Sequence, residues 1–322
     1  MNRFKNILVI ADEASLSDAV IDRAVWLART NKARLTFVDI IDTDPGEMAR
    51  IFSALPGKRA LAVKQEVMRF HETRLHQITQ PLLNEGLDLT ATVLTGTGFI
   101  ETIRQVLDND YDLVLKGAHR GPDRPYLRAP DLHLLRKCPC PVWILNGEAP
   151  AQSRRMLAAV DPDPEDRVRD GLNRTVMELA TSLARHDDAK LDVLNAWHVA
   201  EESTLRHGLV QIPEHEIEAI LVQEEARSSQ GFKHLTAEFA DFADLMRPLH
   251  LKGVAADVVP EHVESEGIDT LVMGTLGRTG IAGFFIGNTA ETILNRVSCS
   301  VIAVKPEGFV TPVRLDHKDP AS

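Results

Sequence analysis

Two heptapeptides decide the fold of this chain: YDLVLKG at residues 111–117 and IDTLVMG at residues 268–274. Each contains an Asp, continues as an apolar run and ends in Gly, and the two lie 157 residues apart. Three further pairs of segments repeat in the same order. They are NILVIAD (6–12) with RMLAAVD (155–161), ARLTFV (33–38) with AKLDVL (189–194), and CPVWI (140–144) with CSVIA (299–303). Four pairs in one order indicate two copies of one domain.

The boundaries follow from the repeat. A polar, turn-rich stretch, NGEAPAQS at residues 146–153, separates the copies and is typical of a linker. We therefore expect a first domain over residues 1–148 and a second over 153–310. The last residues, 311–322, have no apolar anchor at their end, and we expect a mobile tail there.

Each copy alternates apolar runs with segments of helical spacing. In the second copy we expect strands at residues 156–160, 190–197, 249–255, 270–273 and 300–304. Helices are expected at 169–185, 214–246, 258–266 and 289–297. Apolar runs between helices indicate a parallel sheet covered on both faces. The prediction is an α/β protein with two similar open doubly wound domains, each built on a five-stranded parallel sheet. Ligands of such folds bind beyond the carboxyl ends of the strands.

Composition excludes several classes. Hydrophobic residues make up 44% and charged residues 26% of 322, which is typical of a globular protein rather than a disordered one. No apolar run approaches the roughly 18 residues that a membrane span needs. A net charge of −11 disfavours non-specific binding to nucleic acid or anionic membranes. The apolar run after the basic start is too short for a signal peptide, so we expect a cytoplasmic protein with reduced cysteines.

A glycine-rich loop follows the fourth strand of the second copy. Residues 273–291 read MGTLGRTGIAGFFIGNTAE, between that strand and the next predicted helix. Glycine lets backbone approach a ligand closely, and a helix N-terminus offers N–H groups to phosphate oxygens. The loop therefore favours a phosphate site. The alternative is a flexible connection in which Asn288 is only a helix cap.

The spacing Gly274-x2-Gly277-x9-Gly287 resembles the nucleotide-binding loop of the universal stress proteins. The resemblance covers both copies, so the chain is similar to a tandem universal stress protein. The family usually has Ser or Thr after the last glycine, where this chain has Asn288 followed by Thr289.

The resemblance implies a binding site for ATP or another adenine nucleotide such as AMP, with Mg²⁺ as a companion ion. Asp161 matches an acidic residue beside the adenine and ribose, and Val199 an apolar contact to the adenine. The remaining matched positions end the fourth strand or form the phosphate segment: Met273, Gly274, Gly277, Arg278, Gly287, Asn288 and Thr289.

The first copy departs from this pattern. By the offsets of 157 and 159, Arg120 and Arg128 replace Gly277 and Gly287, and Pro130 removes an N–H donor. Asp12 remains at the first strand. We predict that this copy does not bind ATP as the family does. The alternative is an anion site of another kind, formed by His119, Arg120, Arg124 and Arg128.

The last strands of the two copies, at residues 141–145 and 300–304, are apolar and expected at sheet edges, where strands tend to pair. In single-domain relatives this edge is the dimer seam, so the resemblance implies an internal pseudo-dimer; a homodimer is also compatible. Cys138 and Cys140 are expected to lead into the first of these strands rather than to bind metal. His207, His215 and His262 are too scattered to predict a zinc site.

The function expected from these observations is stress-related sensing or regulation by a bound adenine nucleotide, with at most slow hydrolysis and no predicted catalytic residue. Two alternatives stay open. One is an interaction scaffold without nucleotide, and the other is binding of a different phosphorylated metabolite in the same place.

Overall fold

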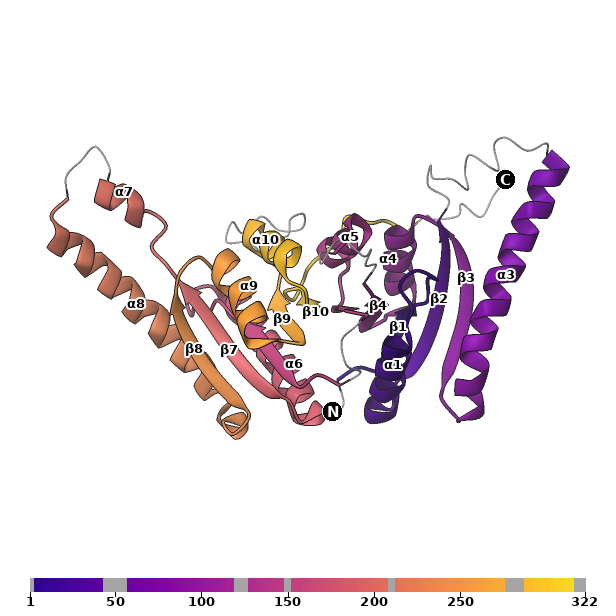
Figure 1. The fold of residues 1–322 in the computed structure, drawn as a ribbon, viewed down its shortest axis with the longest axis horizontal. Helices are drawn as coiled ribbons and strands as arrows, with labels where there is room; N and C mark the ends of the chain where they lie inside the picture. Colours follow the sequence, from indigo (N-terminus) through magenta and orange to yellow (C-terminus); the bar gives the residue numbers. More distant parts are fainter. Residues whose placement is uncertain are drawn as a thin grey trace.

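The computed structural model describes residues 3–42, 57–118, 127–147, 152–207, 212–275 and 287–315. One ten-stranded sheet runs through it, in the order β3-β2-β1-β4-β5-β10-β9-β6-β7-β8 (Figure 1). We call residues 3–147 the first half and 152–315 the second half. Both halves have the same strand order, and the expected fold of two doubly wound units is confirmed.

The first half contains β1 (Asn6–Ile10), α1 (Asp18–Asn31), β2 (Arg34–Asp42), α3 (Gly57–Asn84), β3 (Leu89–Gly96), α4 (Gly98–Asn109), β4 (Leu113–Gly117), α5 (Ala129–Lys137) and β5 (Val142–Leu145). The second contains β6 (Arg155–Ala159), α6 (Arg167–Asp187), β7 (Lys190–Trp197), α7 (Glu202–His207), α8 (Glu214–Ala237), a 3₁₀ turn at Ala240–Phe242, β8 (Met246–Lys252), α9 (Ala255–Glu266), β9 (Thr270–Gly274), α10 (Asn288–Arg296) and β10 (Ser300–Val304).

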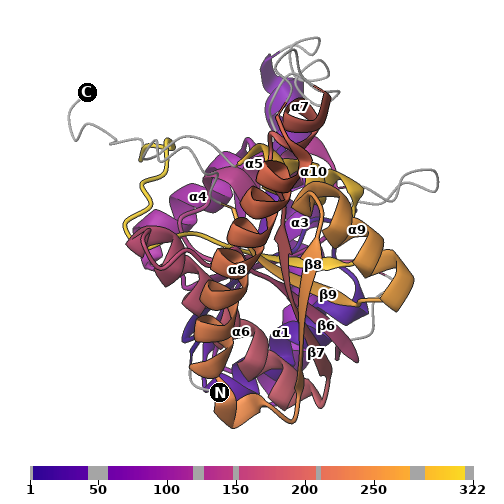
Figure 2. The same cartoon turned by 90° about the vertical axis from the view of Figure 1, so that its left-hand side faces the viewer.

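Two hydrophobic layers cover the sheet. One face packs against α1, α3, α6 and α8, with Leu27, Leu75, Leu179 and Phe232 buried in that layer. The other packs against α4, α5, α9 and α10, with Ile103, Leu135, Val263 and Ile293 buried. The long helices α3 and α8 lie on the outer flanks of the two halves (Figure 1), and Figure 2 shows α8 along its whole length. Because the strands within each half are parallel, their carboxyl ends meet at one edge of the sheet.

Helix ends follow the local sequence. Asp166 caps α6 by accepting hydrogen bonds from the backbone N–H groups of Val168 and Arg169, both at 3.1 Å. Helix α9 ends at Gly267, which has φ +62°, a conformation that glycine adopts without steric cost.

The structure corrects the helix expected at residues 214–246. Helix α8 ends at Ala237, and Met246 already pairs with Leu191 as the first residue of β8. Apolar residues between 238 and 245 keep a helical spacing, but they form turns that bring the chain back beside β7. Strand β8 thus spans Met246–Lys252 rather than 249–255, and it tolerates Pro248 because it lies at the sheet edge. Helix α7 was not predicted.

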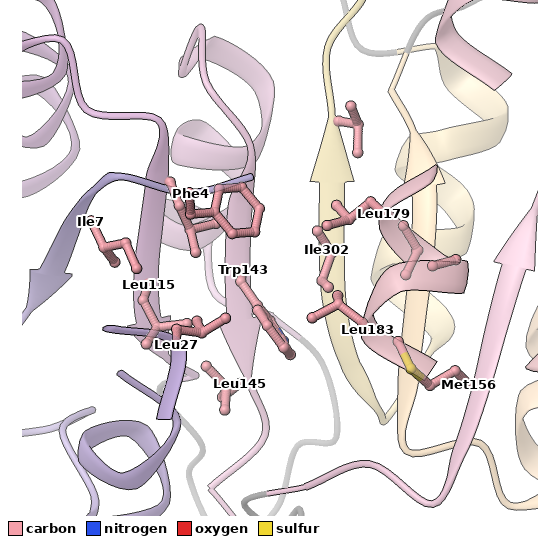
Figure 3. Packing of buried hydrophobic residues seen from close by; sticks show 14 of the residues in the cluster. Phe4, Ile7, Leu27, Leu115, Trp143, Leu145, Met156, Leu179, Leu183 and Ile302 are labelled. Atoms are coloured by element: carbon pink, nitrogen blue, oxygen red, sulfur yellow. The ribbon is translucent and has the colours of Figure 1, made fainter. Parts of the chain in front are cut away.

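The last strands of the two halves pair with each other. Strand β5 runs antiparallel to β10, with Trp143 opposite Ile302, while all other neighbours in the sheet are parallel. Figure 3 shows both side chains directed into the junction. These strands therefore lie in the middle of the sheet rather than at an edge, and the edges are β3 and β8.

A buried ion pair also joins the halves. The Arg23 guanidinium, on α1, donates two hydrogen bonds to the Asp187 carboxylate at the end of α6, at 2.9 and 2.8 Å. Both side chains are almost fully buried, and the guanidinium lies 5.0 Å from the Trp26 ring and 4.9 Å from the Trp143 ring. A bidentate pair between aromatic rings fixes the orientation of the two halves.

Residues 311–315, the start of the expected tail, lie against the first half. Val313 packs on the layer that contains α4, and the Arg104 side chain donates a hydrogen bond to the Arg314 carbonyl at 3.3 Å. The remainder of that tail lies outside the described residues.

Candidate functional site

The predicted site residues of the second half that the structure describes lie at the carboxyl edge of its sheet. Strands β6 and β9 are neighbours, so Asp161, just beyond β6, lies beside the end of β9, where Met273 and Gly274 stand. The Gly287 N–H donates to the Thr275 carbonyl at 3.1 Å, which brings the start of α10 to the same place. Val199 follows the neighbouring strand β7. Gly277 and Arg278 lie outside the described residues.

The backbone of Asp161 is held in place by the Asn173 side chain. Its N–H donates to Asn173 Oδ1, and its carbonyl accepts from Asn173 Nδ2, both at 2.9 Å. The carboxylate itself is about half exposed (49%) and lies 3.8 Å from the Arg169 guanidinium. Asn173, on the buried face of α6, thus fixes the residue, while its acidic group faces solvent at the edge of the sheet.

Two of the predicted positions have structural roles that the sequence did not reveal. The Met273 side chain is 4% exposed and packs in the core. Gly274 contacts α6 so closely that an added Cβ would lie 2.6 Å from the Leu172 side chain. Gly117, its counterpart, would place a Cβ 1.8 Å from the Ser15 carbonyl. Packing against backbone therefore requires glycine at Gly117, whereas a side chain at Gly274 would need Leu172 to move.

The N-terminus of α10 is the part of the site that suits an anion. Gly287 is its cap residue, and no side chain caps the helix within the described residues. Asn288 and Thr289, the first two residues of the helix, are exposed. The first backbone N–H groups of a helix have no partner inside it, so this turn offers donors to a negatively charged group.

The first half contributes two contacts near this turn that sequence reasoning missed. The Arg136 side chain, on α5, pairs with Glu291 in the first turn of α10. Lys305, just after β10, donates to the Leu135 carbonyl at 2.7 Å and to Thr275 Oγ1 at 2.5 Å. Burial lowers the pKa of Lys305 to about 7, and the nearby Cys138 opposes that shift. Because both contacts cross between the halves, no local motif announces them.

The equivalent helix of the first half, α5, is capped by its own sequence. The Asp131 carboxylate, which is fully buried, accepts from the Arg128 N–H at 3.3 Å and from the Lys116 ammonium at 2.8 Å. Lys116 also lies 3.5 Å from the Asp12 carboxylate. A carboxylate of the chain thus lies at the start of α5, bound to the N–H of its cap residue. The equivalent N–H of the second half, that of Gly287, donates to the Thr275 carbonyl. Arg120 and Arg124, which we proposed for an alternative anion site with His119 and Arg128, lie outside the described residues together with His119.

A second difference lies beneath each site, where the second strand meets the long helix. In the first half, the Asp39 carboxylate accepts hydrogen bonds from His71 Nδ1 at 2.7 Å and from the Arg74 guanidinium at 2.6 Å. Arg74 also donates to the Ala11 carbonyl. In the second half, Asn195 accepts from the Ser228 hydroxyl at 2.9 Å and donates to the Val160 carbonyl at 3.1 Å. The two carbonyls occupy equivalent positions at the ends of β1 and β6. An ionic cluster in one half therefore replaces a neutral one in the other.

The two cysteines of the first half lie between α5 and β5. Cys138 ends α5, and Cys140 lies two residues before β5; both are free thiols with their sulfur atoms 3.6 Å apart. In the described parts of the chain, no three His, Cys, Asp or Glu side chains are placed to hold a metal ion. None of the helices described there has the length and hydropathy needed to cross a membrane.

The strand order defines each half as an open doubly wound α/β unit, a class of fold whose ligands bind at the carboxyl ends of the strands. The chain belongs to the universal stress protein family, whose model matches residues 3–146 and again 152–305. The resemblance to a tandem member of that family is thereby confirmed.

Full-length relatives support the same assignment. The chain is 28% identical to universal stress protein E of Escherichia coli K12 over 325 residues, covering 99% of each chain. It is 26% identical to the homologue of that protein in Haemophilus influenzae. Among solved structures, a putative universal stress protein of Pseudomonas aeruginosa superimposes with a TM-score of 0.71 at 22% identity, covering 95% of this chain and 94% of the other.

Proposed function

We propose that the second half binds an adenine nucleotide, ATP or AMP, at the carboxyl edge of its sheet, and that the chain senses or regulates through this binding. The observation that carries the proposal is the contrast between two equivalent helices. Helix α10 has no side-chain cap within the described residues, whereas α5 is capped by the buried Asp131 carboxylate. A phosphate at the start of α10 meets no carboxylate within the first three residues of the helix, whereas one at the start of α5 would lie near that of Asp131.

Each matched residue has a role in this proposal. The N–H groups at Asn288 and Thr289 bind phosphate oxygens, with Gly277 and Arg278 of the loop completing the phosphate segment. Asp161 accepts from the ribose hydroxyls or the adenine, and Val199 packs on the base. Where the ligand is ATP, Mg²⁺ accompanies its phosphates and offsets their charge. The packing of Met273 and Gly274 holds the end of β9 in position.

The proposed role is regulatory, with at most slow hydrolysis. Fast phosphoryl transfer to water needs a group that positions the attacking water near the γ-phosphate. We assign Asp161 to the ribose end of the ligand, and its carboxylate lies beside Arg169. The Glu291 carboxylate pairs with Arg136. Neither carboxylate is arranged as such a group.

We also propose that the β5–β10 pairing replaces the dimer seam of single-domain relatives, so that one chain acts as an internal pseudo-dimer. The antiparallel register of Trp143 with Ile302 and the Arg23–Asp187 pair support it. A further homodimer is compatible with this arrangement.

Calorimetric titration of the full chain with ATP and Mg²⁺ tests the nucleotide proposal. We expect saturable binding to the wild type and at least a 100-fold loss in Gly287→Arg, which copies Arg128 of the first half. Gly171→Arg is the matched control, because Gly171 is exposed on α6 and an added Cβ meets nothing within 4 Å. It should bind within twofold of the wild type. No binding to the wild type, or equal binding to Gly287→Arg, contradicts the proposal.

A further inference from the structure

The last turn of α5, in the first half, contacts the second half at both ends of the glycine-rich loop. Figures 1 and 2 both show α5 beside α10. Thr275 lies where the loop begins, and its hydroxyl accepts a hydrogen bond from Lys305, which also donates to the Leu135 carbonyl of α5. Arg136, the next residue of α5, pairs with Glu291 in the first turn of α10, after the loop has ended. Two consecutive residues of the first half therefore reach the proposed phosphate site.

The Arg136–Glu291 pair brings a carboxylate and its counter-charge to that site. The Glu291 N–H donates to the Gly287 carbonyl at 2.9 Å, so Glu291 stands one turn beyond the N–H groups that we assign to the phosphates. Like charges repel each other, and a carboxylate this close would lower the affinity for a phosphate. The Arg136 guanidinium offsets the charge of Glu291 and thereby removes most of this cost.

The ion pair runs in one direction between the halves. Helices α5 and α10 both have nine residues, and their alignment makes Leu132 the equivalent of Glu291 and Asn295 the equivalent of Arg136. A leucine and an asparagine cannot form an ion pair, so the second half cannot return this contact to the start of α5. The pair thus occurs only at the helix where we propose that a nucleotide binds.

We propose that Arg136 of the first half is a positioning residue for the nucleotide site of the second half. It acts through Glu291: by pairing with that carboxylate, it keeps the first turn of α10 free of an uncompensated negative charge. The first half therefore raises the nucleotide affinity of the second without binding the nucleotide itself. This inference rests on the nucleotide site proposed above and adds the part that the first half plays in it.

A double-mutant cycle on the full chain tests the proposal by calorimetric titration with ATP and Mg²⁺ in 0.05 M NaCl. Arg136→Met should weaken binding about fivefold, because Glu291 then acts on the phosphates without its counter-charge. The loss should shrink in 0.5 M NaCl, which screens the repulsion. Glu291→Gln combined with Arg136→Met should bind within twofold of Glu291→Gln alone, since no carboxylate is left to compensate.

Arg29→Met is the matched control. Arg29 forms an ion pair with Glu85 where α1 and α3 end, so this variant also removes one arginine from a pair between two segments of the first half. It should bind ATP within twofold of the wild type at both salt concentrations.

The possible results separate this inference from the nucleotide proposal. If the wild type does not bind ATP, both fail. If the wild type binds and Arg136→Met binds equally well, only the role of Arg136 is overturned. It is also overturned if the double variant binds as weakly as Arg136→Met, because Arg136 would then act on the ligand or on the fold rather than through Glu291.

Discussion

The two halves share strand order and most of their packing, and they differ where their ligands would bind. In the first half, charged groups fill the edge of the sheet: Lys116 and Asp131 at the start of α5, and Asp39 with Arg74 where β2 meets α3. In the second half the equivalent positions are Met273, Ala290, Asn195 and Gly231. Duplication thus kept the scaffold, and a few substitutions placed buried ion pairs in the first half where the second half has neutral side chains.

Gly231 shows how closely these substitutions are linked. A Cβ there would lie 3.3 Å from the Pro162 carbonyl oxygen, so α8 approaches the loop after β6 closely at this position. Asn195 then takes over the bond to the first-strand carbonyl that Arg74 makes in the other half. Both positions of the Asp39–Arg74 pair are therefore neutral in the second half.

The largest expected effect comes from Lys116→Met, which copies Met273. It leaves the Asp131 carboxylate buried without its cation, and breaking a buried ion pair costs about 3–5 kcal/mol. Urea unfolding of the variant should show a loss of that size.

Asp131→Ala, which copies Ala290, provides the control. Added to Lys116→Met, it removes the stranded charge, so the double variant should recover most of the loss. If the single variant unfolds at the wild-type urea concentration, the two halves do not differ in the way described.

Asn195→Asp tests the second network. The new carboxylate would be buried with no arginine at position 231, and we expect a loss of roughly 3 kcal/mol at pH 7, as for a buried charged group without a partner. Burial raises the pKa of such a carboxyl above its unfolded value, so the loss should shrink as the pH falls toward 4 and the group becomes protonated. Denaturation at pH 4 and pH 7 measures this. An equal loss at both pH values would point to a steric cause instead.

Lys305 connects the halves and is expected to titrate near neutrality. Its pKa of about 7 is below the ordinary value of 10.5, so between these values the unfolded chain binds more protons than the folded chain. Stability should therefore rise with pH in this window, by at most about 1.4 kcal/mol per pH unit from this group. Lys305→Met should flatten the profile between pH 7 and 9. An unchanged slope would show that the ammonium is well accommodated by Leu135 and Thr275.

The smallest effect is expected for Arg136→Met. Its ion pair with Glu291 is partly exposed, 26% and 38% for the two side chains, and such pairs contribute about 1 kcal/mol or less. Thermal unfolding should shift only slightly. A large loss would mean that this contact, rather than the Arg23–Asp187 pair and the β5–β10 strands, holds the halves together.

Much of the fold could be predicted because apolar runs and repeated segments are local signals. The strands at residues 190–197 and 300–304 were placed correctly for that reason. The length of α8 was not, since residues 238–245 keep helical spacing and only the pairing of Met246 with Leu191 shows where β8 begins. The glycine loop could also be recognised, because its spacing lies within one segment.

The chemistry of the first half could not be predicted in the same way. Asp39 and Arg74 are 35 residues apart and meet only when α3 packs on β2. The loop arginines left an anion site open as an alternative, and His119, Arg120 and Arg124 lie outside the described residues. Arg136 and Lys305 act across the junction of the halves, and no pattern in either segment indicates a partner so distant in sequence.

Native mass spectrometry of the full chain with excess ATP and Mg²⁺ tests the central claim, that only the edge with the uncapped helix accepts a nucleotide. The account predicts one nucleotide per chain, lost in Gly287→Arg and kept in Gly171→Arg. Two nucleotides per chain, or a single one that persists in Gly287→Arg, would contradict it.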